Sequence, residues 1–81
     1  MRNKKPRHEE IAEIIRERIT SGELKPRYRI PSHTEFSVEF NASVRTVSRA
    51  IASLRERNFL WTLPHKGSYA RPPEHWRKEA Q

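Results

Sequence analysis

The spacing of apolar residues along the chain predicts three helices. In residues 8–21, isoleucines recur every three or four positions, which places them on one face of a first helix. A second helix is expected over residues 33–40, where Phe36 and Phe40 share a face. A third is expected over residues 44–57, and its buried stripe would consist of Val47, Ala50, Ile51 and Leu54.

Capping residues mark where the second and third helices begin and end. Ser32, followed three residues later by Glu35, forms a capping box at the start of the second helix. Ser43 can cap the third helix in a similar way. Asn41 and Asn58 stand at the two helix ends, and asparagine is one of the few residues that accept the left-handed backbone of a tight turn. The second and third helices therefore form a helix-turn-helix.

A β-hairpin is expected after the third helix. Residues 59–63 have strand composition, and residues 68–71 would form the return strand. Residues 64–67, with the sequence PHKG, fit a four-residue loop built on a type I turn and closed by the glycine. Trp61 and Tyr69 would pack the hairpin against the helices. The predicted fold is mainly α with a small β-hairpin: a winged helix-turn-helix of three helices and a two-stranded wing.

The chain has 81 residues, which is enough for one small domain. We divide it into a basic arm at residues 1–7, the winged helix at residues 8–71, and a polar tail or linker stub at residues 72–81. The tail is polar apart from Trp76. The segment at residues 28–30 is too short for more than an edge strand.

Composition narrows the class of protein. The formal net charge is +7, which suits a nucleic-acid partner. There is no cysteine, which excludes disulfides and thiolate metal ligands, and the four histidines are widely spaced with no cluster of acidic ligands. With two glycines the chain has no glycine-rich loop to hold a phosphate. We therefore expect a protein that is not an enzyme and needs no cofactor or metal.

We expect no membrane-spanning or signal segment in this sequence. No apolar run approaches the roughly 20 residues that a membrane span needs, and no signal-peptide core follows the basic N-terminus. We therefore expect a cytoplasmic protein without a membrane partner.

The face of the third helix opposite its buried stripe carries the first candidate DNA contacts. At 100° per residue, the outward-facing residues are Val44, Arg45, Ser48, Arg49 and Ala52, with Thr46 on the flank. Arginine can donate two parallel hydrogen bonds to guanine O6 and N7, and serine or threonine can donate to base edges or phosphates. Arg45 and Arg49 are one turn apart, so both can face the same groove.

Further contacts are expected on both sides of this helix. The wing tip concentrates His65 and Lys66 beside Gly67, and a cationic hairpin can straddle phosphates or enter the minor groove. Serine and threonine near the helix starts can donate to phosphates. The full candidate DNA-binding set is Ser32, Thr34, Ser43, Arg45, Thr46, Ser48, Arg49, His65, Lys66 and Gly67.

Our leading hypothesis is sequence-specific binding of double-stranded DNA, and two other functions fit the same pattern. The third helix could dock a partner protein, although that use calls for exposed apolar anchors on its outer face. The chain could also be a non-specific architectural DNA binder. Footprinting would separate the last function from the first, because only a specific regulator protects a defined site.

A longer pattern runs through residues 11–70. It includes SGELKP at residues 21–26, IPS at residues 30–32, Glu35, Phe40, Ser43, Thr46, Val47, Ala50, Leu54 and Gly67. This pattern resembles the N-terminal winged-helix domain of the GntR-type bacterial transcription regulators. The match is spread over four elements at the correct spacing.

The resemblance implies a DNA-binding repressor or activator, and we expect a repressor, that reads a short inverted repeat as a dimer. Members of this family often carry arginine at the positions of Thr34 and Val44, and glycine at those of Arg27, Asn41, Asn58 and His65. The family normally continues into a C-terminal domain that binds a metabolite and dimerises. The sequence stops shortly after the winged helix, so we expect no small-molecule effector site in this chain.

Overall fold

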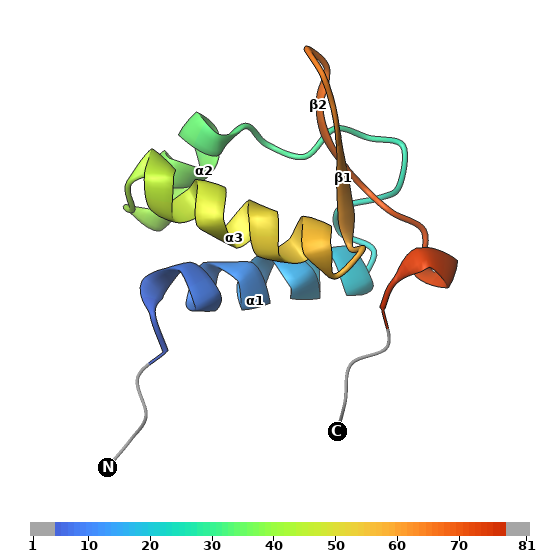
Figure 1. The fold of residues 1–81 in the computed structure, drawn as a ribbon, viewed down its shortest axis with the longest axis horizontal. Helices are drawn as coiled ribbons and strands as arrows, with labels where there is room; N and C mark the ends of the chain where they lie inside the picture. The colour runs from blue at the N-terminus through green and yellow to red at the C-terminus, as the bar shows by residue number, and fades with distance from the viewer. Residues whose placement is uncertain (1–4, 78–81) are drawn as a thin grey trace.

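The computed structural model describes residues 5–77, so residues 1–4 of the predicted arm and 78–81 of the predicted tail lie outside it. The order of elements is α1 at Arg7–Thr20, α2 at His33–Phe40, α3 at Val44–Glu56, β1 at Leu60–Leu63, β2 at Gly67–Ala70 and a short 3₁₀ helix, η1, at Pro73–His75. In Figure 1, α1 lies along α3, and the antiparallel hairpin of β1 and β2 stands up from the C-terminal end of α3. The predicted winged helix-turn-helix is confirmed, and each helix and strand lies within one residue of its expected bounds.

The core forms where the apolar faces of the three helices meet the base of the wing. The predicted stripe of α3 is confirmed, since Val47, Ala50, Ile51 and Leu54 have no exposed surface. The isoleucine face of α1 packs against it, with Ile14 only partly buried. Phe36 and Phe40 of α2 close one side with ring centroids 5.7 Å apart. Burial of these side chains is the main source of stability in a domain of this size.

The predicted caps hold the helix-turn-helix in place. Ser32 Oγ accepts a hydrogen bond from the backbone N–H of Glu35 at 3.0 Å, and Ser32 N–H donates to Glu35 Oε1 at 2.8 Å. Asn41, with a φ of 52°, and Asn58, with a φ of 65°, both adopt the left-handed conformation. The expected roles of these asparagines are therefore confirmed.

The two faces of the wing differ from expectation. In the register of the hairpin, Leu60 pairs with Ala70 and both are buried toward the helices. Trp61 pairs with Tyr69 on the opposite face, and Trp61 keeps 42% of its surface exposed. The prediction that Trp61 and Tyr69 pack the wing against the helices is therefore wrong. Successive side chains of a strand alternate between faces, and the buried pair of Leu60 and Ala70 occupies the helix side.

The turn of the wing also differs from expectation. Leu63 pairs with Gly67, so the loop has three residues, 64–66, instead of four. Lys66 N–H donates to Leu63 O at 3.0 Å, and His65 between them has a φ of 63°. A positive φ at the third position of the turn, after a proline, is typical of a type II turn and not of the expected type I turn.

The segment before α2 joins the edge of the wing. Arg29 forms an isolated antiparallel bridge with Tyr69, and Ile30 N–H donates to Ser68 O at 2.9 Å. The sequence predicts no more than an edge strand at residues 28–30, and this short pairing agrees with that prediction. It ties the loop that leads into α2 to the returning strand of the wing.

Trp76, the one large apolar residue near the C-terminal end, packs back onto the domain. Its ring centroid lies 5.5 Å from that of Phe59, and its indole N–H donates to Arg71 O at 2.8 Å. Arg77 N–H also donates to Arg57 O at 3.0 Å. The described part of residues 72–77 therefore extends the core beyond the wing. No helix within residues 5–77 is long and apolar enough to cross a membrane.

The two tryptophans allow a direct comparison of an inward and an outward aromatic side chain. We expect Trp76→Ala to lower the free energy of unfolding by about 2 kcal/mol, because it removes a half-buried ring and a hydrogen bond. Trp61→Ala should cost less than about 1 kcal/mol, because that ring lies on the outer face of the wing. Urea unfolding followed by far-ultraviolet circular dichroism measures both, and equal losses would contradict the packing of Trp76.

Candidate nucleic-acid interface

The outer face of α3 carries two unpaired arginines. Arg45, Ser48 and Arg49 are all exposed on the side opposite the buried stripe. Within residues 5–77, the side chain of neither Arg45 nor Arg49 makes a hydrogen bond or an ion pair. Both guanidinium groups therefore keep their full set of donors for a partner outside the chain.

Arginines on the α1 side of the domain are paired instead. The ion pairs are Arg7 with Glu10, Arg16 and Arg57 with Glu13, and Arg18 with Glu23 and Glu39. The hydrogen bond from Arg16 lowers the pKa of Glu13 below its usual value, and the hydrogen bond from Arg18 does the same for Glu39. These carboxylates stay charged and neutralise cations away from the outer face of α3.

The start of α3 is organised by a cap. Ser43 Oγ accepts a hydrogen bond from Thr46 N–H at 3.0 Å and donates its proton to Thr46 Oγ1 at 2.9 Å. A hydroxyl has only one proton to donate, so that of Ser43 is occupied within the helix and that of Thr46 remains free. The first turn of α3 contains no acidic residue, so the positive end of the helix dipole is not neutralised there.

The start of α2 and the inner face of the wing form a groove of about 560 Å³. Ser32 and Thr34 line it from the α2 side, and Thr62, Gly67 and Ser68 line it from the wing. The fold thus brings together candidate residues that are more than thirty positions apart in the sequence. His65 and Lys66 stand exposed beyond this groove at the tip of the wing.

The tip is supported by Arg29 from the segment before α2. A β-carbon added to Gly67 would lie 2.5 Å from Arg29 Cδ, so the side chain of Arg29 crosses the wing where only glycine leaves room. Arg29 Nη1 donates to Lys66 O at 3.4 Å. Gly67 has a φ of 107°, a second reason for glycine at this position. Glycine is therefore favoured at residue 67 for two reasons: its own backbone conformation and the close approach of Arg29.

A comparison with protein-family models decides the family. Residues 7–69 match the model of the bacterial regulatory proteins of the gntR family. This chain belongs to the gntR family. The resemblance seen in its sequence is therefore confirmed, and the family is one of regulators and not of enzymes.

Two repressors are similar to this chain over most of its length. The chain is 37% identical over 67 residues to the mannosyl-D-glycerate transport/metabolism system repressor MngR of Escherichia coli, a match that covers 83% of this chain and 28% of MngR. It is 33% identical over 69 residues to the histidine utilization repressor of Klebsiella aerogenes, covering 85% of this chain and 29% of that protein. The chain thus spans less than a third of the length of these curated relatives.

A solved structure shares the fold of this chain. The AraR DBD crystallised in complex with operator ORR3 superposes with a TM-score of 0.83 at 24% identity, covering 88% of this chain and 86% of that one. At this level of identity the similarity establishes the winged-helix fold.

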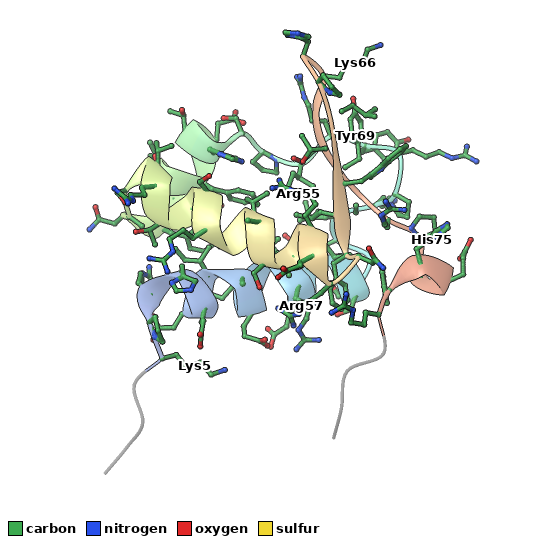
Figure 2. The ribbon with its side chains drawn as sticks, viewed as in Figure 1. Lys5, Arg55, Arg57, Lys66, Tyr69 and His75 are labelled. Atoms are coloured by element: carbon green, nitrogen blue, oxygen red, sulfur yellow. The ribbon has the colours of Figure 1, made fainter. Side chains whose placement is uncertain are left out.

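Two arginines near the candidate interface were missed by sequence reasoning. Arg55 Nη1 donates to Thr62 Oγ1 at 3.4 Å, and Figure 2 shows Arg55 in the angle between α3 and the wing, with Lys66 at the tip. Helical spacing could have found it, because Arg55 follows Ser48 by two turns. Arg29 had no such local signal, since its contact with Gly67 depends on the approach of two distant segments.

No candidate metal site was found among the described residues. Within residues 5–77, no three histidine, aspartate or glutamate side chains gather closely enough to hold a metal ion. The side chains that the structure places around the outer face of α3 are cations, hydroxyls and the exposed Val44.

The two glycines provide a matched test of the support at the wing tip. Gly22→Ala introduces backbone strain alone, because Gly22 has a φ of 92° and no atom lies within 4 Å of an added β-carbon. We expect it to cost roughly 1–2 kcal/mol. Gly67→Ala should cost about 1 kcal/mol more, because it also displaces Arg29.

Urea unfolding of both variants, alone and combined with Arg29→Ala, separates the two contributions. The extra cost of Gly67→Ala should disappear in the Arg29→Ala background. If that cost persists without the Arg29 side chain, the close approach of Arg29 is not its cause.

Proposed function

We propose that this chain is a sequence-specific reader of double-stranded DNA that regulates transcription as a repressor. The observation that carries the proposal is the pair of exposed, unpaired arginines on α3, directly opposite the stripe that fixes this helix in the core. Their setting between a capped α2 and a basic wing tip supports the same function. MngR and the histidine utilization repressor are named repressors, which favours repression over activation.

In the proposed complex, α3 lies in the major groove. Arg45 and Arg49 donate to guanine O6 and N7, the contact that arginine geometry serves best. Thr46 and Ser48 donate to base edges or neighbouring phosphates. Ser43 acts through its cap, since its hydroxyl proton is already bound to Thr46.

The residues on either side of α3 hold the DNA backbone. Ser32 and Thr34 at the start of α2 donate to phosphates. His65 and Lys66 reach the backbone or the minor groove from the wing, with Gly67 keeping the tip close to Arg29. Arg55 adds a cation between these two regions.

We further propose that two copies bind an inverted repeat in the bacterial cytoplasm. A two-fold arrangement of the protein would be matched by two half-sites about one helical turn apart. Selection of bound sequences from random duplexes at physiological salt tests this directly. An enriched motif with two-fold symmetry supports two copies, a single half-site supports one, and the absence of any enriched motif would favour a non-specific binder.

Arg49→Ala tests base reading on the selected duplex. We expect it to weaken specific binding by about 1–3 kcal/mol and to leave binding to a random duplex nearly unchanged. Lys25→Ala is a control that also removes one exposed cation, but from the loop after α1. Fluorescence anisotropy measures both, and an equal loss on specific and random duplexes would remove Arg49 from base readout.

Lys66→Ala tests the wing as a backbone contact. If four to six phosphates are neutralised, log K falls against log salt with a slope of roughly −4 to −5. Removing Lys66 should lower the magnitude of that slope by about one and weaken binding evenly across sequences. An unchanged slope would place Lys66 away from the phosphates.

A further inference from the structure

Val44 is an exposed apolar residue at the edge of the polar face of α3. It is the first residue of this helix and keeps 47% of its surface exposed, one turn before Ser48 and next to Arg45. The cap hydrogen bond from Thr46 N–H to Ser43 Oγ at 3.0 Å fixes the helical turn on which Val44 stands. A β-branched side chain in a helix has one strongly preferred rotamer, so its two methyl groups point in a fixed direction.

The chemistry of the major groove limits what such a side chain can recognise. Among the four standard bases, only thymine presents an apolar group there, its C5-methyl. A valine placed against any other base edge would displace water from polar atoms and offer no hydrogen bond in return. A fixed valine at the start of a recognition helix therefore favours thymine over the other bases.

An exposed valine can also have no function, and the chain provides an example for comparison. Val38 on α2 is 77% exposed, and scattered apolar residues on a protein surface are common. Val44 differs from Val38 in its place, because it shares the first turn of α3 with Arg45. Residues near the N-terminal end of a recognition helix are the ones that reach base edges.

We propose that Val44 is a specificity-determining residue that reads the C5-methyl of a thymine beside the base pair contacted by Arg45. This inference rests on the proposed function, in which α3 enters the major groove. It adds that each half-site carries a thymine whose methyl group contributes to binding. Val44 makes this contact without a charge, so its contribution is independent of salt.

The test replaces single thymines of the selected duplex by deoxyuridine, which lacks only the C5-methyl. Anisotropy titrations compare the unmodified protein with Val44→Ala and Val38→Ala. At one thymine in each half-site, we expect the replacement to weaken binding of the unmodified protein and of Val38→Ala roughly fourfold. That factor corresponds to about 0.8 kcal/mol for one buried carbon group.

Val44→Ala should show no loss at the same thymine. Equal losses for all three proteins at every thymine, or none at any thymine, would overturn the role of Val44 while specific binding and the proposed function stand. Failure to select any specific duplex would overturn the proposed function first, and the role of Val44 with it. We expect Val44→Ala to fold, because alanine is the best helix former and the position is half exposed, and circular dichroism checks this.

Discussion

The burial of one side of α3 is the constraint on which the rest of the structure depends. This helix packs against α1, α2 and β1, and the side chains of Val47, Ile51 and Leu54 are fully enclosed by those contacts. Because a helix cannot rotate without moving its whole stripe, the opposite face is fixed in direction as firmly as the core. The positions of the exposed Arg45 and Arg49 are therefore set by the buried residues of the same helix.

Among the described residues, ion pairs lie on the α1 side of the domain, and cations without ion pairs lie on the outer face of α3 and at the wing tip. Glutamates of α1 and α2 pair with arginines beside them, and such exposed pairs contribute little to stability in water. Their larger effect is on the electrostatic field, since they neutralise cations on the α1 side and leave those of α3 and the wing tip unopposed. Within residues 5–77, Arg45 and Arg49 of α3 and Lys66 of the wing tip are thereby left without an ion pair where an anionic partner would bind.

Local signals predicted most of the fold, and contacts between distant segments account for what they missed. The capping box of Ser32 and the left-handed Asn41 act within a few residues, so the sequence shows them directly. The two faces of the wing could not be assigned in this way, because alternation defines two sets of side chains without saying which set faces the helices. The positive φ of His65 was missed because a proline permits type I and type II turns alike. The contacts of Arg29 with the wing and of Trp76 with Phe59 exist only once the chain has folded back on itself.

The contact between Arg29 and Gly67 links the two regions proposed to hold the DNA backbone. Arg29 precedes α2 by a few residues and crosses the wing near its tip, while Ile30 is hydrogen-bonded to Ser68 of the returning strand. The start of α2 and the wing tip are therefore parts of one frame around α3. In the proposed complex, phosphate contacts from this frame set the depth and angle of the helix, and base contacts then decide the sequence. A residue such as Val44 can discriminate a single methyl group only when its position relative to the groove is fixed, and in the proposed complex this frame would fix it.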